Sequence, residues 1–376
     1  MKFSLLPVAL VISCSVFAQP VTLNVVSTDF NNVKVNPATP VKSQDMTGTC
    51  WCFSTTSLVE SEAIRTSQKS LDLSEMFSVR NIYLEKAKNY VLRVGKAQFG
   101  EGGLGHDMIR AIATYGAEPE SVYSGLINGE KKFNHQEMVS KLQAYLDSVI
   151  KVQPVKADWI PGYTAILDEF MGKAPGEFEF EGKKYTPLTF AKEVVHFNIN
   201  DYVSITSFTH QPYYSSFILQ VPDNFANGSF YNLPMKDMMD VVANAVKNGY
   251  TVSWDADVSN NGFRQDKGLA LYLDPTQKYK SADLTPETTE QPWTVETRQH
   301  LYENLTTQDD HLMHLTGYEE SKSGKKFFLV KNSWGNVGPF NGYINVSESY
   351  FAINTISVVV PKAALSKEVL AKLQIQ

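Results

Sequence analysis

The stretch that decides the fold runs Gln44-Asp45-Met46-Thr47-Gly48-Thr49-Cys50-Trp51-Cys52-Phe53-Ser54. A glycine permits a tight turn before Thr49, a candidate N-cap, and the run from Cys50 to Arg65 has helical character. A cysteine in the first turn of a helix lies at the positive end of the helix dipole, where we expect its thiolate to be stabilised and its pKa lowered. Gln44 can fold back so that its side-chain amide and the Cys50 N–H face one oxyanion. The stretch therefore predicts a cysteine nucleophile beside its oxyanion donors.

Cysteine usage supports this interpretation. The chain has three cysteines, Cys14, Cys50 and Cys52, and the first lies in a predicted N-terminal targeting segment. The other two are separated by one residue, so on a helix they point to different faces and cannot easily form a disulfide. We therefore expect no structural disulfide, with Cys52 as a small buried hydrophobe and Cys50 as the reactive thiol.

A base for the thiol is offered by the run Asp310-His311-Leu312-Met313-His314-Leu315-Thr316-Gly317-Tyr318. The run is strand-like, and on a strand His311 and His314 face opposite sides because their offset is odd. Only one of them can therefore face a catalytic cleft. A metal pair at this spacing would need a helix and further ligands, so we expect no metal site.

The third segment follows a bulky, apolar strand at residues 327–331 and reads Asn332-Ser333-Trp334-Gly335. An Asn at the end of a buried strand can accept a hydrogen bond from one imidazole nitrogen and fix the tautomer of the ring. Trp334 can cover that hydrogen bond and exclude water. The segment therefore predicts the group that orients the base.

These segments, together with Asn341-Gly342-Tyr343, resemble the catalytic segments of papain-like cysteine peptidases. The resemblance implies that Cys50 is the nucleophile, His311 the base, Asn332 the orienter and Gln44 the oxyanion donor. It also implies an α+β fold with a helical lobe, a lobe rich in antiparallel strands and a cleft between them. Peptide substrates, no cofactor and a thioester acyl-enzyme follow from the same resemblance. An amidase or transpeptidase of the same chemistry, or an inactive binding protein on this scaffold, are the alternatives.

Two features depart from the usual papain pattern. Thr47 stands where papain-like enzymes usually carry a disulfide cysteine. His311 lies 261 residues after Cys50, whereas the usual separation is about 130–150 residues. We therefore expect an insertion of roughly a hundred residues.

The inserted region resembles that of the bleomycin hydrolase and aminopeptidase C branch of the family. Apolar periodicity predicts helices at residues 136–152 and 163–171, a hairpin at residues 178–185 and a helix opening at Thr186-Pro187. We expect a helical lobe at about 40–125, an inserted helical region at about 126–230 and a β-rich lobe at about 231–376, all within one peptidase domain at 19–376.

Substrate binding is predicted at three residues. Glu101-Gly102-Gly103 precedes an amphipathic helix and resembles the Gly-Gly segment that pairs with an extended peptide in papain-like enzymes. Trp334 is the third predicted substrate-binding residue. In the branch, a tail after the last helix anchors the substrate amino terminus, and here only Gln374-Ile375-Gln376 follow that helix. We therefore expect blocked amino termini to be tolerated, with the choice between exopeptidase and endopeptidase left open.

The first eighteen residues predict an export signal. Lys2 precedes an apolar run that is too short to span a bilayer, and Val16-Phe17-Ala18 offers a cleavage site before Gln19. The alternative is a lipoprotein, because Val11-Ile12-Ser13-Cys14 has the shape of a lipidation box. We favour cleavage after Ala18 and a periplasmic or secreted location.

Composition excludes two further classes. The formal net charge is −6 and no dense Lys/Arg run is present, which argues against nucleic acid as a partner. No later segment approaches the ~18 consecutive apolar residues of a transmembrane helix. The sequence leaves the oligomeric state open.

Overall fold

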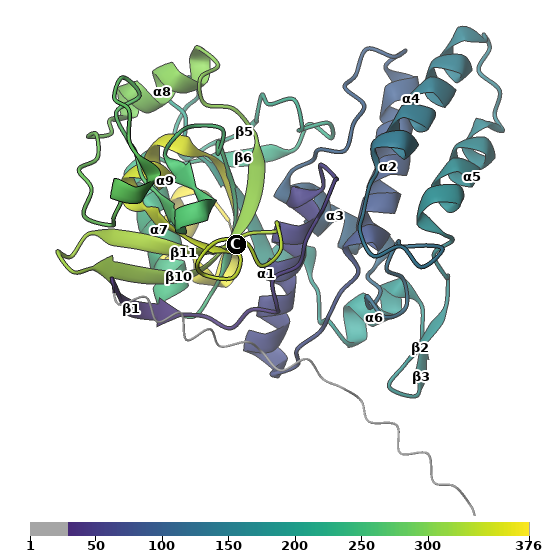
Figure 1. Cartoon of the computed structure of the whole chain (residues 1–376). Helices are drawn as coiled ribbons and strands as arrows, with labels where there is room; N and C mark the ends of the chain where they lie inside the picture. Colours follow the sequence, from purple (N-terminus) through teal and green to yellow (C-terminus); the bar gives the residue numbers. More distant parts are fainter. Residues whose placement is uncertain (1–28, 376) are drawn as a thin grey trace, which may run out of the picture.

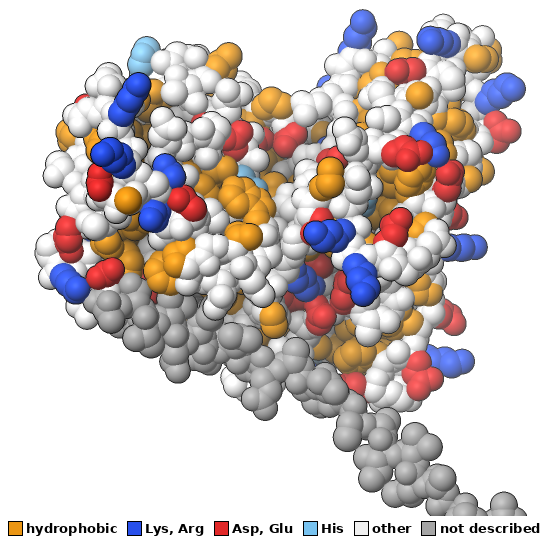
Figure 2. Space-filling view, viewed as in Figure 1, with side chains coloured by type: hydrophobic (Ala, Val, Ile, Leu, Met, Phe, Trp, Pro, Cys, Tyr) orange, Lys and Arg blue, Asp and Glu red, His pale blue; other side chains and the backbone are white. Residues whose placement is uncertain are grey.

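The computed structural model describes residues 29–375, so the predicted export signal and Cys14 lie outside the described part. Two halves face each other, a helical half at the right of Figure 1 and a half built on a large sheet at the left. In space-filling form the halves are separated by a notch, and acidic side chains are visible near its floor (Figure 2). The predicted α+β fold with two lobes is confirmed.

Helix α1 (Cys50–Ser67) lies between the two halves and begins at Cys50. It contacts α2 (Glu75–Leu92) and α3 (Gly105–Tyr115) on one side, and strands β7 (Val252–Ala256) and β10 (His311–Ser321) on the other. Most of its side chains are buried, small polar ones included, and Ser54 Oγ donates to the Met313 carbonyl at 2.6 Å. Because α1 is packed on both sides, its first residue is held firmly where the halves meet.

The helical half contains the inserted region. Its further elements are α4 (Gln136–Lys151), α5 (Trp159–Met171), the hairpin strands β2 (Phe178–Phe180) and β3 (Lys183–Tyr185), and α6 (Pro187–Glu193). The hairpin turns at Glu181 and Gly182, both with positive φ, and the Thr186 side chain accepts from the Thr189 N–H to cap α6. These local predictions are confirmed, and α5 begins four residues earlier than expected.

In the other half, eleven strands within residues 29–375 join into one sheet in the order β5-β6-β4-β13-β7-β10-β11-β12-β9-β8, with β1 beside β10. The strands not yet given are β1 (Phe30–Val35), β4 (Tyr202–Thr206), β5 (Ser216–Ile218), β6 (Ser229–Asn232), β8 (Phe263–Arg264), β9 (Leu269–Ala270), β11 (Lys326–Lys331), β12 (Tyr343–Ser347) and β13 (Thr355–Pro361). Its helices are α7 (Met235–Lys247), α8 (Val295–Glu303), α9 (Glu348–Asn354) and α10 (Lys367–Lys372).

The sheet begins earlier in the chain than expected. Strand β4 pairs with β13 along its length, and β6 joins β4, so residues 202–232 contribute to the β-rich half. The inserted region predicted at about 126–230 includes β4 and β5 and the first half of β6. The β13 partner of β4 lies about 150 residues further along the chain, which a local pattern cannot show.

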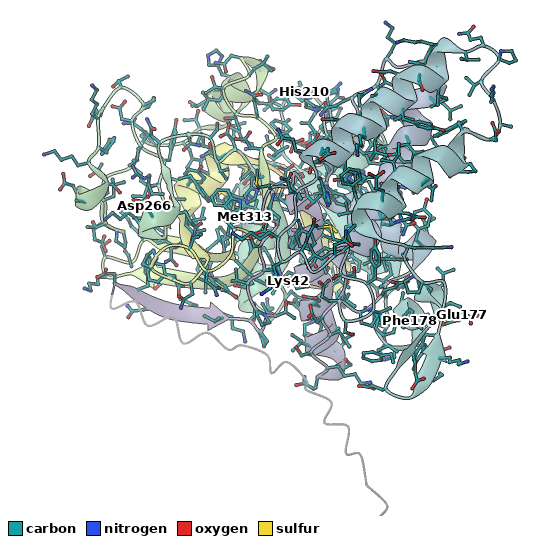
Figure 3. The ribbon with its side chains drawn as sticks, turned by 45° about the vertical axis from the view of Figure 1, so that its right-hand side comes forward. Lys42, Glu177, Phe178, His210, Asp266 and Met313 are labelled. Carbon is teal, nitrogen blue, oxygen red and sulfur yellow. The ribbon has the colours of Figure 1, made fainter. Side chains whose placement is uncertain are left out.

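Each half has its own apolar core. One core packs α1–α6, and the other packs α7 and α9 against the strands of the sheet. Lys42 and Met313 lie near the middle of the molecule, whereas Phe178 of the hairpin lies at the edge of the helical half (Figure 3). None of the helices in residues 29–375 is long and apolar enough to cross a membrane.

Candidate active site

The predicted base and its orienter meet at one end of two neighbouring strands of the sheet. His311 is the first residue of β10, Asn332 follows the last residue of β11, and these two strands pair antiparallel. His311 Nε2 and Asn332 Oδ1 are 2.7 Å apart, and the Asn332 Nδ2 group donates to Gln265 Oε1 at 3.0 Å. The amide oxygen of Asn332 therefore accepts, so Nε2 of the imidazole carries the proton and Nδ1 is left with a free lone pair. This tautomer is the one that a general base requires.

Trp334 covers the imidazole–amide pair. Its ring is stacked on that of His311, with centroids 4.7 Å apart and planes at 30°. The indole is 37% exposed, so it shields the hydrogen bond on one side and presents its other side to solvent. Burial lowers the pKa of His311 to about 4, although the hydrogen bond with Asn332 acts in the opposite direction. At neutral pH the ring is uncharged and can accept a proton.

The expected direction of the Cys50 pKa shift is wrong. The side chain is 8% exposed, and burial raises the pKa of the thiol to about 12. A backbone hydrogen bond with Leu312 lowers this pKa, whereas the carboxylates of Asp309, Asp255 and Asp223 raise it further. Burial destabilises a thiolate by more than the helix dipole stabilises one in the first turn, because the dipole contributes about 2 kcal/mol at most. Cys50 is therefore a neutral thiol in the free protein and needs a base.

Cys50 and His311 come from elements that pack together, since α1 contacts β10. The thiol interacts with the backbone of Leu312, the residue that follows His311. Within residues 29–375 the structure gives no hydrogen bond between the thiol and the imidazole. Catalytic hydrogen bonds of this kind commonly tighten only when substrate is bound. The site thus holds a neutral thiol at the start of α1 and a neutral imidazole at the start of β10, two elements that pack together.

Gln44 is fixed by the loop that carries Asn332. Its backbone N–H donates to the Ser333 carbonyl at 2.9 Å, and the Ser333 hydroxyl donates to Gln44 Oε1 at 2.7 Å. One hydrogen of the Gln44 amide is used on the Thr47 carbonyl at 2.7 Å, which leaves the second for a ligand. The predicted cap is different: Thr49 occupies the N-cap position of α1, but its hydroxyl bonds that of Thr47 instead.

From this geometry we expect Gln44→Ala to lower kcat by roughly 10²- to 10³-fold with little change in KM, because one oxyanion donor is lost. Ser333→Ala is the matched control: it removes one contact that holds Gln44 but keeps the donor, so its effect on kcat is expected to be smaller. Steady-state kinetics on a peptide amide distinguish the two variants. A near-normal kcat for Gln44→Ala would mean that other donors hold the oxyanion.

A side chain at either position of the predicted Gly-Gly segment would displace a neighbouring side chain. A Cβ on Gly102 would clash with the Asp223 carboxylate, and a Cβ on Gly103 would lie 3.1 Å from the Trp51 indole. Trp51 is itself fixed by a hydrogen bond from its Nε1 to the Glu101 carbonyl at 3.0 Å. The segment is therefore packed against the residue that follows Cys50.

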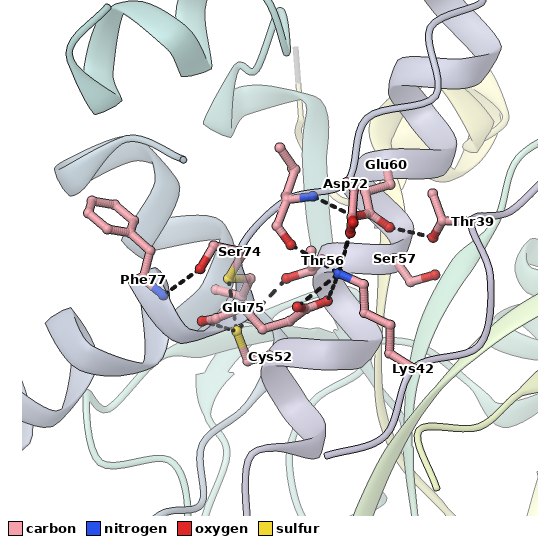
Figure 4. Close-up of polar contacts among 12 residues, drawn as sticks. Thr39, Lys42, Cys52, Thr56, Ser57, Glu60, Asp72, Ser74, Glu75 and Phe77 are labelled. Atoms are coloured by element: carbon pink, nitrogen blue, oxygen red, sulfur yellow. Dashed lines mark hydrogen bonds and ion pairs between the residues drawn. The ribbon is translucent and has the colours of Figure 1, made fainter. Parts of the chain in front are cut away.

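His314 and Cys52, the other histidine and cysteine in the catalytic segments, are both buried. His314 is 1% exposed, and neither ring nitrogen has a hydrogen-bond partner. Cys52 is fully buried, and its thiol donates to the Glu75 carbonyl at 3.2 Å. Around Glu75, Lys42 forms ion pairs with three carboxylates in a cluster that joins the N-terminal loop to α1 and α2 (Figure 4). Cys52 is thus part of the structural interior, as expected.

Sequence reasoning missed several residues of the site. Gln265 orients the Asn332 amide, Ser333 orients Gln44, and Asp223, Asp255 and Asp309 act on the thiol. None of them stands in a motif with recognisable spacing. Groups of three or more metal-ligating side chains with suitable geometry are not found among residues 29–375.

Fold and site together define a papain-like protein: a thiol begins the helix between the two halves, and an imidazole–amide pair lies on two strands of the sheet, one of which packs against that helix. A model of the Peptidase C1-like family matches residues 96–376, and a model of the papain family of cysteine proteases matches residues 26–155. The chain belongs to the Peptidase C1-like family and is a cysteine-type peptidase.

The chain is similar to several aminopeptidases of bacteria. The chain is 24% identical to Aminopeptidase G of Lactobacillus delbrueckii subsp. lactis, over 88% of this chain and 83% of that protein. It is also 24% identical to Aminopeptidase C of Streptococcus thermophilus, over 88% and 82% respectively. The crystal structure of PepW from Lactobacillus rhamnosis superposes with a TM-score of 0.75 at 22% identity, covering 92% of this chain and 84% of that one. The fold is thus shared over most of the length.

Proposed function

We propose that this chain is an exported cysteine peptidase that hydrolyses peptide bonds through Cys50, His311 and Asn332, with Gln44 as an oxyanion donor. The observation that carries the proposal is the 2.7 Å hydrogen bond between His311 Nε2 and Asn332 Oδ1. It sets the tautomer in which Nδ1 can take a proton from the thiol. The position of Cys50 at the start of α1, against β10, supports the same assignment.

The reaction follows from these groups. His311 takes the thiol proton as Cys50 sulfur attacks the amide carbonyl, and the oxyanion lies between the Gln44 amide and the Cys50 N–H. The imidazolium then gives its proton to the leaving amine, and the C–N bond breaks to leave a thioester. Water, deprotonated by the neutral imidazole, attacks the thioester and releases the carboxylic acid and the thiol.

The names of the relatives suggest that the peptides carry a free amino terminus, since aminopeptidases remove amino-terminal residues. Export rests on the sequence of the first eighteen residues alone. An exported aminopeptidase would degrade peptides outside the cytoplasm, a role consistent with both the names of the relatives and the predicted export signal.

The test is the hydrolysis of fluorogenic peptide amides by the purified protein, with and without prior alkylation by iodoacetamide. Turnover that alkylation abolishes supports the proposal, and turnover that survives full alkylation contradicts a thiol mechanism. Export is tested separately by sequencing the amino terminus of the protein from cell fractions. A start at Gln19 agrees with cleavage after Ala18, whereas a lipidated Cys14 would assign the protein to a membrane surface.

A further inference from the structure

A cavity lies in the β-rich half, outside the predicted catalytic segments. Its volume is about 540 Å³, within the range of roughly 300–1,000 Å³ that small-molecule sites occupy. Its walls come from within residues 257–264 after β7, residues 272–279 after β9, residues 301–307 at the end of α8 and residues 353–354 at the end of α9. Helices α8 and α9 are labelled at the left of Figure 1. None of the predicted catalytic residues lines this cavity, so it is separate from the candidate active site.

The walls of the cavity are fixed by hydrogen bonds within the protein. Asn260 Nδ2 donates to the Tyr350 hydroxyl at 2.9 Å, and Asn260 Oδ1 accepts from the Gly262 N–H at 3.0 Å. On the opposite segment, the Tyr272 N–H donates to Glu290 Oε1 at 2.7 Å. Because these contacts already hold the loops in place, a ligand does not have to order them on binding.

The charged side chains on the lining cancel one another: they are Asp257, Asp274, Arg264 and Lys278. The carboxylates of Asp257 and Asp274 accept hydrogen bonds from residues of their own loops. Arg264 Nε pairs with Asp266 Oδ1 at 3.0 Å, and the Lys278 residue is exposed to solvent. The lining therefore presents no net charge that would select a cation or an anion.

The polar groups that remain open on the lining are neutral. The neutral side chains there that make no hydrogen bond within residues 29–375 are those of Asn261, Tyr272, Tyr279, Thr306 and Thr307. Thr307 is only 5% exposed, so a partner for its hydroxyl has to come from the cavity that it lines. Hydroxyl and carboxamide groups can each both donate and accept a hydrogen bond. The open groups thus fit a ligand whose own polar groups do the same.

We propose that this cavity binds a neutral saccharide of one or two sugar rings. Sugar hydroxyls both donate and accept, as the open hydroxyl and amide groups of the lining do, whereas an anion needs donors alone and a cation needs acceptors alone. The rings of Tyr272 and Tyr279 add apolar faces for the C–H side of a sugar ring, and each phenol adds a polar group beside that face. The binding goes beyond the proposed peptidase function and does not depend on it.

Saturation-transfer difference NMR on the purified wild-type protein tests the proposal with defined sugars. The neutral probes are glucose, galactose, N-acetylglucosamine and cellobiose, each titrated at millimolar concentrations. Glucosamine and glucuronate are the charged counterparts, because each keeps the glucose ring and adds one charge of either sign. We expect saturable binding of at least one neutral sugar, and no tighter binding of either charged one, because the lining carries no net charge.

Two variants assign the binding to this cavity. Thr307→Val and Tyr272→Phe each remove one hydroxyl and keep the shape of the side chain, so each should raise the Kd of the bound sugar by about 2- to 10-fold, as for one neutral hydrogen bond. Asn200→Ala, at an exposed residue outside the cavity, should leave the Kd unchanged. Thermal melting shows whether each variant is folded, and Tyr272→Phe, at a half-buried residue, serves if Thr307→Val is not.

Three results would overturn the saccharide site. The first is the absence of saturable binding for every neutral sugar, and the second is a charged sugar that binds more tightly than all the neutral ones. The third is binding that the folded Thr307→Val and Tyr272→Phe variants both leave unchanged, since the sugar would then lie elsewhere. None of these measurements uses hydrolysis, so the peptidase function stands or falls separately.

Discussion

Cys50→Ala is expected to lower kcat/KM by about 10⁵-fold or more. Alanine fits the first turn of α1 and removes only the sulfur, so the helix and the cleft remain intact while the acyl-enzyme can no longer form. The residual rate would reflect the oxyanion donors and substrate binding alone. Hydrolysis of a peptide amide under single-turnover conditions measures the loss.

The matched control is Cys52→Ala, two residues further along the same helix. Cys52 is fully buried and contacts the Glu75 carbonyl and the Met108 sulfur. Its removal should destabilise the protein by about 1 kcal/mol and leave kcat/KM within a few fold of wild type. Full activity in Cys50→Ala, or a loss of rate confined to Cys52→Ala, would mean that the nucleophile is misassigned.

His311→Ala is expected to lower kcat by roughly 10⁴- to 10⁶-fold, because the neutral thiol then has no base. Burial raises the pKa of Cys50 to about 12. Little thiolate therefore exists at neutral pH unless a base takes the thiol proton. The same burial lowers the pKa of His311 to about 4. A protonated imidazole cannot accept the thiol proton, so the rate of the wild-type enzyme should fall as the pH drops through the pKa of His311, well below the ordinary histidine range.

His314→Ala provides the comparison on the same strand. Its ring is buried and makes no hydrogen bond, so its loss should change the melting temperature rather than kcat. Kinetics and thermal melting on both variants decide the matter. If His314→Ala loses the greater part of kcat while His311→Ala stays active, the assignment of the base has to be reversed.

The parts of the structure that the sequence predicts well are those fixed by local chemistry. A threonine followed by proline starts α6 at Pro187, and the Glu181–Gly182 pair turns the hairpin because both residues take positive φ. Helix α4 ends within one residue of its predicted boundary, since its buried residues repeat at helical spacing. The odd offset along β10 likewise separates His311 from His314 without any knowledge of the partner strands.

The parts that the sequence does not predict depend on residues distant in the chain. The direction of the Cys50 pKa shift depends on burial and on three carboxylates more than 170 residues away. Strand β4 belongs to the sheet because β13 pairs with it, and the Asn332 amide is oriented by Gln265. Thr49 has the residue type of a cap, yet its hydroxyl bonds Thr47. In each case the outcome depends on a contact with residues that the local sequence pattern does not include.

The most direct test of a peptidase built on Cys50 is to treat the folded protein with an epoxysuccinyl peptide and map the adduct by mass spectrometry. Such a reagent occupies a peptide cleft and alkylates a thiol that an adjacent base can deprotonate, so it reports nucleophile, base and cleft together. We predict one adduct on Cys50, formed in step with the loss of hydrolysis and absent in His311→Ala. An adduct mainly on Cys52, or complete hydrolytic activity after Cys50 is fully modified, would contradict the assignment.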